Sequence, residues 1–113
     1  MDELAKKKCI PCEKKGIKAF DRTEAERYAA QVHGWILSDD AKKIEREFVF
    51  KDFIGSIDFI NAIADIAEAE GHHPDIYIFY NKVRLELSTH AIGGLSENDF
   101  IVAAKIDRIL PFH

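Results

Sequence analysis

The sequence contains no apolar run long enough to span a bilayer, which argues against a transmembrane helix. Its first residues, MDELAKKKCIPCEKK, have no apolar segment after the lysines, and this argues against a secretory signal. We therefore expect a cytoplasmic protein. Internal repeats, low-complexity tracts and linkers rich in proline or glycine are also missing. With 113 residues, the chain should form a single domain over residues 1–113.

An excess of positive charge is absent as well. Sixteen Lys and Arg residues oppose twenty Asp and Glu residues, which gives a net charge of −4 at pH 7. Because phosphate contacts need concentrated Lys and Arg, this balance argues against a nucleic-acid partner. The lysines at positions 6–8, 14 and 15 form a local basic cluster, which is typical of a solvated tail.

Cysteine is confined to Cys9 and Cys12, in the motif CIPC. A thioredoxin-like site would need a strand before the motif, but only eight mostly polar residues precede it. A zinc site would need two further ligands, and no second CxxC exists, although His33 or a partner chain could complete one. We expect two reduced thiols in an irregular N-terminal arm over residues 1–20.

Periodic patterns predict three helices and four strands. The expected elements are a helix from 23 to about 33, strands at 35–37 and 43–50, a helix from about 52 to 70, strands at 76–80 and 83–88, and a helix from 96 to about 109. Capping boxes should begin the first and last helices, at Thr23 and Ser96. Gly34 and Gly71 are placed to end the first and second helices.

The second helix and the third strand carry pronounced apolar patterns. In the helix, apolar residues recur at 53, 57, 60, 64 and 67, with 63 and 66 widening the stripe. Every residue from Ile76 to Tyr80 is apolar, which predicts a strand covered on both faces. A turn at Asn81-Lys82 should join it to the fourth strand.

Two hairpins separated by one long helix indicate an α+β fold. We expect a four-stranded antiparallel sheet with three helices packed on one face, in the order α-β-β-α-β-β-α. Such a sheet would leave its other face open. The apolar third strand therefore indicates that another subunit covers part of the sheet, in a homo-oligomer.

Three histidines are expected to converge at one end of this sheet. His72 and His73 lie in the loop before the third strand, and His90 follows the fourth. Since a tight turn joins these two strands, the start of one and the end of the other must be neighbours. Glu68, in the last turn of the preceding helix, and Asp99, at the start of the final helix, could face the same place.

Three interpretations of the histidines are open. They could be ordinary loop histidines. They could bind a catalytic zinc, but the side chains of adjacent histidines usually diverge, which makes joint ligation difficult. Metal-free general acid–base catalysis is favoured, because one imidazole can take a proton while another delivers one elsewhere, and a carboxylate can fix the tautomer. Such chemistry suits the elimination of water from a small polar substrate.

The spacing of these residues resembles that of a known family. Glu68, the HHP motif at 72–74, Tyr80, His90 and Asp99 follow one another at intervals similar to those of the pterin-4a-carbinolamine dehydratase signature. The family's second hairpin and last helix resemble YNKVRLELSTH and GLSENDF. The start of its first strand resembles HGW, and CIPC is common near the N-terminus of its members.

The resemblance implies an enzyme that removes water from 4a-hydroxytetrahydropterin to give quinonoid dihydropterin, without a metal or a cofactor, in tetrahydrobiopterin recycling. It also implies a homodimer or homotetramer with a pterin as its small-molecule substrate. By analogy, His72, His73 and His90 carry the catalysis, and Glu68 and Asp99 support them. Losing one such acid or base typically costs about 10²–10⁴-fold in rate.

The resemblance also implies a substrate-binding backbone at two strand ends, whose N–H and C=O groups can match the edge of a pterin. This set consists of Gly71, His72, His73, Ser88, Thr89 and His90. Two positions depart from the family pattern, because Gly71 stands where many members have Asp and Ile76 where many have Trp. The alternative function is a non-catalytic dimerisation module of the same fold that acts as a transcription cofactor, although a pure binding module has no chemical need for three histidines.

Overall fold

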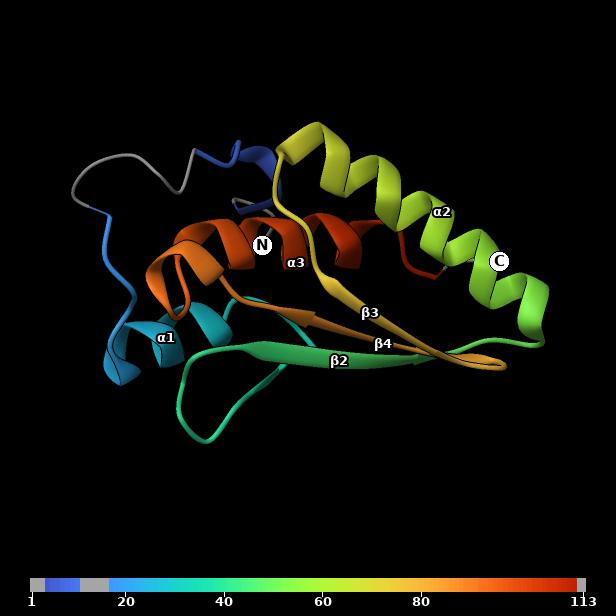
Figure 1. Cartoon of the computed structure of the whole chain (residues 1–113), viewed down its shortest axis with the longest axis horizontal. Coiled ribbons are helices and arrows are strands. Elements are labelled where there is room, and N and C mark those ends of the chain that lie inside the picture. The colour runs from blue at the N-terminus through green and yellow to red at the C-terminus, as the bar shows by residue number, and fades with distance from the viewer. Residues whose placement is uncertain (1–3, 11–16, 112–113) are drawn as a thin grey trace.

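The computed structural model describes residues 4–10 and 17–111 (Figure 1). Its elements are η1 (Leu4–Lys6), α1 (Arg22–Ala29), β1 (Ile36–Leu37), β2 (Ile44–Val49), α2 (Phe53–Glu70), β3 (Asp75–Phe79), β4 (Lys82–Leu87), η2 (His90–Ile92) and α3 (Glu97–Arg108). The strands form one antiparallel sheet in the order β1-β2-β4-β3, and α2 and α3 lie along one side of it. The predicted α+β class and element order are confirmed.

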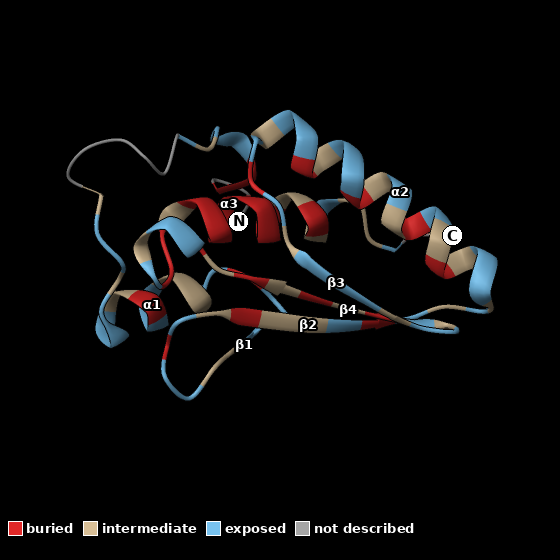
Figure 2. Cartoon of the chain, in the orientation of Figure 1, coloured by how far each residue is buried: buried red, intermediate tan, exposed pale blue. Residues whose placement is uncertain are grey.

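The core lies between β4, its neighbour β2 and the two long helices (Figure 2). Alternate residues of β4, namely Val83, Leu85 and Leu87, are fully buried. Because side chains of a strand alternate between its two faces, Arg84 and Glu86 project from the opposite side of the sheet. In the described part of the chain, no helix combines the length and apolarity that crossing a membrane requires.

Helix α2 has the predicted ends but a different buried face. Gly71 follows it in the left-handed conformation, with φ of 66°, as predicted. Its buried residues are Ser56, Phe59, Ile63 and Ala67, whereas Phe53 is 45% exposed and Ala64 is also exposed. The predicted stripe was wrong at Phe53 and Ala64 and missed Phe59, because α2 is apolar on several faces, so periodicity alone does not select the buried one.

Helix α1 begins and ends earlier than predicted. Asp21 caps it, since the Asp21 carboxylate accepts a hydrogen bond from the backbone N–H of Glu24 at 2.9 Å. The predicted capping box at Thr23 was therefore wrong, because DRTE offers two residues that can cap a helix and the earlier one does so. The helix ends at Ala29, and the chain then turns through Gly34 at φ of 81°.

The hairpin between β3 and β4 turns one residue earlier than predicted. Phe79 pairs with Lys82, so the turn consists of Tyr80 and Asn81, and Tyr80 has a positive φ of 53°. β3 is an edge strand, and only Ile78 of its five residues is partly buried. A strand covered on both faces is therefore wrong within one chain, because the other four residues of β3 are exposed.

Residues 4–10 are fixed to the helices. Leu4 and Ala5 are buried, and Ile10 and Asn98 exchange two hydrogen bonds, of 3.0 Å and 2.6 Å. The backbone N–H of Cys9 donates to the Glu70 carboxylate at 2.9 Å. The expected irregular arm thus includes one short 3-10 helix, and its Cys12 lies outside the described residues.

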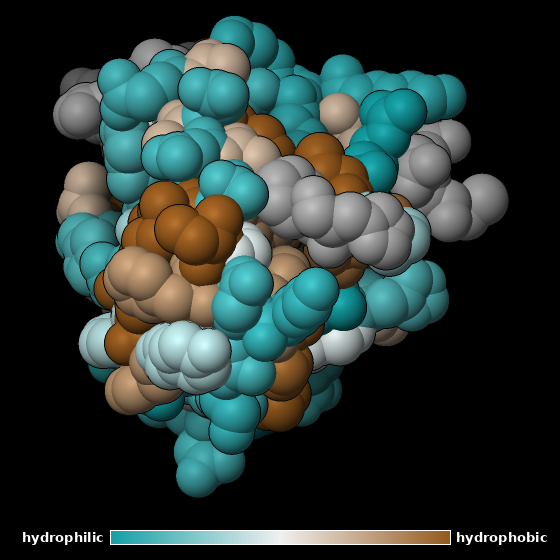
Figure 3. All heavy atoms as spheres, turned by 90° about the vertical axis from the view of Figure 1, so that its right-hand side faces the viewer, coloured by the Kyte–Doolittle hydropathy of each residue, from teal (hydrophilic) through white to brown (hydrophobic). Residues whose placement is uncertain are grey.

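The end of the sheet remote from the histidines is apolar. The corner between β2 and α2 exposes Val49, Phe53 and Ile54, and the hairpin turn exposes Phe79 and Tyr80. Figure 3 views the molecule from this end and shows apolar side chains gathered in patches between hydrophilic ones. We call these five residues the apolar end.

Candidate active site

His72 occupies the most enclosed position of the three histidines. The turn that ends α2 brings it inward, and its side chain is 6% exposed. Its Nε2 lies 2.6 Å from Oδ1 of Asp99, which is fully buried. Since an ionised carboxylate only accepts, His72 donates through Nε2–H in this arrangement.

Asp99 joins three segments at this point. Its second oxygen, Oδ2, accepts hydrogen bonds from the Thr89 hydroxyl at 2.8 Å and from the backbone N–H of Ser96 at 3.0 Å. The latter is half of the capping box that begins α3, so the predicted cap at Ser96 is confirmed. One carboxylate therefore ties the end of α2, the end of β4 and the start of α3 together.

His73 points the other way, toward α2. Its Nε2 lies 2.6 Å from Oε2 of Glu68, and the two side chains are 57% and 78% exposed. The spacing of five residues allows this contact, because Glu68 lies in the last turn of the helix that precedes the loop. His73 is therefore held by a solvent-exposed contact with Glu68, a residue close to it in sequence.

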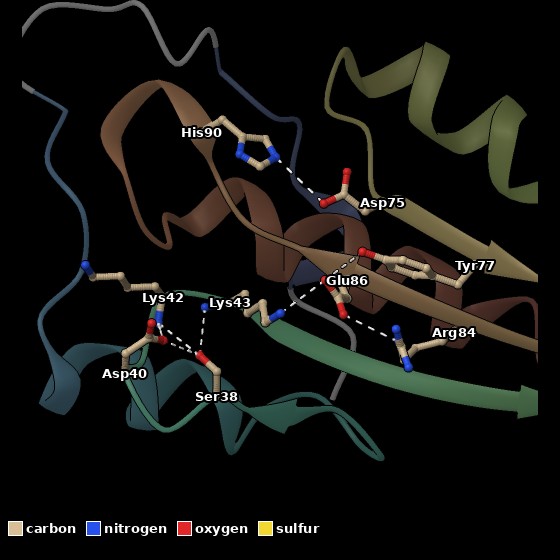
Figure 4. Close-up of polar contacts among 9 residues, drawn as sticks. All are labelled: Ser38, Asp40, Lys42, Lys43, Asp75, Tyr77, Arg84, Glu86 and His90. Atoms are coloured by element: carbon tan, nitrogen blue, oxygen red, sulfur yellow. Dashed lines mark hydrogen bonds and ion pairs between the residues drawn. The ribbon is translucent and has the colours of Figure 1, made fainter.

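His90 begins η2, directly after Thr89, and its side chain is 77% exposed. Its Nε2 faces the carboxylate of Asp75, with 3.8 Å between Nε2 and Oδ2 (Figure 4). The sequence did not single out Asp75. Asp75 could have been predicted from its position at the start of β3, because the hairpin places that position beside the end of β4.

Each histidine thus faces a carboxylate of its own. Thr89 and His72 share Asp99, which sets the end of β4 beside the HHP loop, whereas His73 turns toward α2. Within residues 4–10 and 17–111, no cluster of three or more His, Cys, Asp or Glu side chains could hold a metal ion.

A pocket of about 350 Å³ opens beside His90. The loop between β1 and β2 and the segment after β4 line it, with Asp40, Lys42, Lys43, Ser88, His90, Gly93 and Gly94. Of the predicted substrate-binding residues, Ser88 and His90 are in this lining, and Thr89 is buried. Gly71, His72 and His73 are not part of it.

The β1–β2 loop forms a charged wall of this pocket, and no motif in the sequence predicted it. The hydrogen bond from the Ser38 hydroxyl to Asp40, at 2.7 Å, and a second from the backbone of Lys42 lower the pKa of the Asp40 carboxyl. Lys43 donates to Glu86 at 3.2 Å, and this bond and the charge of Glu86 raise the pKa of Lys43 (Figure 4). Asp40 and Lys43 are therefore both charged at neutral pH.

The cysteine motif contributes no reactive group at Cys9. Burial and the charge of Glu70 raise the pKa of the Cys9 thiol to about 12, and its Sγ donates to the backbone oxygen of Asn98 at 3.6 Å. Because the thiolate is the reactive form, Cys9 is protonated and unreactive at neutral pH. In the described residues no strand precedes Cys9, so the thioredoxin-like alternative has no support there.

Comparison with known proteins decides the family. The model of the family described as pterin 4 alpha carbinolamine dehydratase matches residues 18–109. The chain belongs to the pterin-4-alpha-carbinolamine dehydratase family. The resemblance predicted from the histidine motif is thereby confirmed.

Relatives in this dehydratase family align with nearly the whole chain. It is 46% identical over 110 residues to pterin-4-alpha-carbinolamine dehydratase 2, mitochondrial, of Arabidopsis thaliana, and the match covers 95% of this chain and 59% of that protein. It is 45% identical over 106 residues to a protein of Halorhodospira halophila that is named provisionally for the same activity, with 94% and 96% covered.

Solved structures of similar fold extend the comparison. A transcriptional coactivator/pterin dehydratase from Brucella melitensis superposes with a TM-score of 0.76 at 33% identity, over 81% of this chain and 98% of that one. A pterin dehydratase-like protein identified as a RuBisCO assembly factor in the alpha-carboxysome gives a TM-score of 0.60 at 22% identity, over 72% and 94%. The second likeness shows a shared fold alone.

Proposed function

We propose that the protein is a hydro-lyase that removes water from a 4a-hydroxytetrahydropterin and so takes part in tetrahydrobiopterin recycling. The observation that carries this proposal is the set of three histidines, each facing a carboxylate, at the end of the sheet where a pocket opens. A volume of about 350 Å³ is within the usual range for a small-molecule site. The family supports the substrate class. The cytoplasmic location expected from the sequence stays a prediction.

The proposed reaction moves one proton onto the substrate and one proton off it. The C4a–O bond breaks while an acid protonates the hydroxyl, which leaves as water, and a base takes the proton from N5. No electrons are gained or lost, so side-chain acids and bases are sufficient. An imidazole can serve either purpose near neutral pH.

The three histidines have different parts in this proposal. His90 lines the pocket and is 77% exposed, so its ring can exchange a proton with a bound substrate directly. His73 lies outside the pocket lining but is 57% exposed, so its ring is open to proton exchange from the α2 side. His72 is 6% exposed and contributes with the tautomer that Asp99 fixes. The backbones of 71–73 and 88–90 are proposed to bind the edge of the pterin.

The test is the dehydration rate of 4a-hydroxytetrahydropterin, generated in situ and followed by ultraviolet absorbance. We expect the wild type to accelerate it, and His73→Ala and His90→Ala each to lose about 10²–10⁴-fold. A wild-type rate equal to the uncatalysed one would overturn the proposed activity. Stoichiometric zinc in the purified protein, measured by elemental analysis, would overturn its metal-free part.

We also propose that the protein is a homodimer or homotetramer. Two surfaces support this proposal, namely the edge of β3 that pairs with no described strand, and the apolar end. Size-exclusion chromatography with light scattering should give a multiple of the 12.9 kDa chain mass. Phe79→Lys and Ile54→Lys should each shift the mass toward the monomer if their surface is an interface.

A binding module that acts as a transcription cofactor is the second candidate. It is supported by the Brucella melitensis protein, which is described as a transcriptional coactivator as well as a pterin dehydratase. The dehydration assay separates the two candidates, because a pure binding module would leave the uncatalysed rate unchanged. An active enzyme with a protein partner would satisfy both.

A further inference from the structure

The pair of His90 and Asp75 joins the two loops that carry the histidine motif. Asp75 comes two residues after His73, and its Oδ2 lies 3.8 Å from Nε2 of His90 (Figure 4). We infer that Asp75 is a positioning residue for His90, which holds the ring through Nε2 and leaves Nδ1 for proton exchange with the substrate. This inference rests on the proposed dehydratase function.

The backbones on both sides of this pair are fixed. Asp75 begins β3 and lies opposite Glu86 in the sheet. His90 follows Thr89, which is anchored to Asp99 and bridges to Gly94, where two backbone hydrogen bonds of 2.7 Å and 3.4 Å close the loop. The distance between the two side chains is therefore set mainly by their own rotamers.

A distance of 3.8 Å is too long for a hydrogen bond, but the pair is placed to form one. Both side chains are exposed, His90 at 77% and Asp75 at 52%, so neither is held away by packing. Hydrogen bonds between catalytic groups are often long without substrate and shorten when it binds. A rotation of either side chain would bring Oδ2 of Asp75 within reach of Nε2–H.

The neighbouring carboxylates have other partners. Asp99 binds His72, and Glu68 binds His73. On the pocket wall, Asp40 accepts from Ser38 and from the backbone of Lys42. Glu86 accepts from Lys43 and lies near Arg84 and Tyr77, as Figure 4 shows. Asp75 is thus the carboxylate that faces the ring of His90.

The carboxylate assists the proton transfer without taking the proton. A carboxylate that accepts from Nε2–H selects the tautomer whose lone pair is on Nδ1, and Nδ1 can then accept a proton from the substrate. The imidazolium formed is stabilised by the negative charge opposite it and returns to neutral when the proton leaves. Asp75 takes up no proton in this step, so atoms and charges balance within the elimination.

Two substitutions of Asp75 test this inference through turnover. Asp75→Asn should lower kcat by roughly tenfold to a hundredfold, the range seen when the partner that orients a metal-bound histidine is removed. KM should stay within about twofold, because ground-state binding does not need the pair. Asp75→Glu should recover most of kcat. Asp65→Asn, the same charge change at an exposed residue of α2, should leave both constants unchanged.

A second measurement needs no turnover. Nitrogen-15 chemical shifts of the histidine rings report which ring nitrogen carries the proton, so Asp75→Asn should move the two His90 signals toward the opposite tautomer. Glu68→Gln is the matched control, since it should move the His73 signals and leave those of His90 in place.

The outcomes are distinguishable. Unchanged kcat together with unchanged His90 signals in Asp75→Asn would overturn the positioning function. A fall in kcat that Asp75→Glu does not reverse, with His90 unmoved, would also overturn it and indicate a structural effect. If the wild type shows no dehydratase activity, the proposed function fails, and the His90 signals alone decide whether Asp75 orients this ring.

Discussion

His72 and His90 stand at the same end of the sheet, and each faces a carboxylate, yet the two pairs differ in burial and distance. His72 and Asp99 are 6% and 0% exposed and lie 2.6 Å apart. His90 and Asp75 are 77% and 52% exposed and lie 3.8 Å apart. The first pair is part of the core, and the second is an adjustable contact in solvent.

Because of this difference, we expect the buried pair to contribute mainly to the stability of the fold and the exposed pair mainly to the proposed reaction. Removing one partner from a buried hydrogen-bonded pair leaves the polar atoms of the other partner unsatisfied and costs much of the stability of a small domain. An exposed pair contributes little to folding, because water solvates both groups. Substitutions at the buried pair should therefore act mainly through the fold, and those at the exposed pair mainly through the reaction.

The largest expected effect on stability is that of Asp99→Ala. It leaves His72, the Thr89 hydroxyl and the backbone N–H of Ser96 without their acceptor. Each buried polar group left without a partner costs about 1–3 kcal/mol, so the free energy of unfolding in urea should fall by about 3–5 kcal/mol. Asp99→Asn keeps one acceptor oxygen and should lose less. A loss below about 1 kcal/mol for Asp99→Ala would contradict the view that this pair is part of the core.

A smaller effect is expected when the cap beside this pair is removed. Ser96 begins α3, and its Oγ lies 2.8 Å from the Thr89 hydroxyl. Ser96→Ala should lower the free energy of unfolding by about 1 kcal/mol. Ser96→Thr retains the hydroxyl and should lose less. Equal losses in the two variants would show that the hydroxyl is not the stabilising group.

The contacts of Glu70, the last residue of α2, should stabilise the fold in a pH-dependent way. Glu70 accepts hydrogen bonds from the backbone N–H of Cys9 at 2.9 Å and from Lys105 at 2.6 Å. Burial alone would raise the pKa of Glu70, but these two bonds and the charge of Lys105 outweigh it, so the pKa is lowered from 4.5. A carboxyl with a lowered folded pKa stabilises the fold above its unfolded pKa, and that stabilisation is lost as the pH falls through the folded pKa.

Glu70→Gln should therefore flatten the acid side of the stability curve. In wild type, the free energy of unfolding should decrease as the pH falls below about 4.5, and the variant should show less of this decrease. Urea unfolding at a series of pH values measures it. Glu47→Gln, at an exposed position of β2, should keep the wild-type slope, and the same slope in Glu70→Gln would contradict the expectation.

The smallest effect on stability is expected for His90→Ala, despite its large predicted effect on rate. With a side chain 77% exposed, its loss should change the free energy of unfolding by less than about 0.5 kcal/mol. The same urea measurement checks this. A larger loss would place His90 among the structural residues and weaken the contrast with His72.

Local signals made parts of this molecule predictable from sequence. Gly71 and Ser96 act on neighbours within a few residues, so the end of α2 and the start of α3 were foreseen. The HHP and STH motifs identified the three histidines because each motif is a short, contiguous stretch of sequence. The turn at Tyr80 was misplaced because a tyrosine at positive φ gives no sequence signal of its own.

Contacts set by strand pairing were harder to predict. Asp75 meets His90 only through the register of β3 and β4. The wall formed by the β1–β2 loop reaches the pocket only because β2 pairs with β4, more than thirty residues further along the chain. The buried face of α2 was uncertain because apolar residues occur around its circumference, and the sheet alone selects one side.

The short β1 strand has a consequence for how this fold can diversify. Only Ile36 and Leu37 pair with β2, so the following loop is tied to the sheet by few bonds while it lines the pocket. Mutations there can reshape the pocket and leave the three histidine–carboxylate pairs intact. Under the proposed function, substitutions in the loop over residues 38–43 should change which ligands fit the pocket without altering the proton-transfer groups.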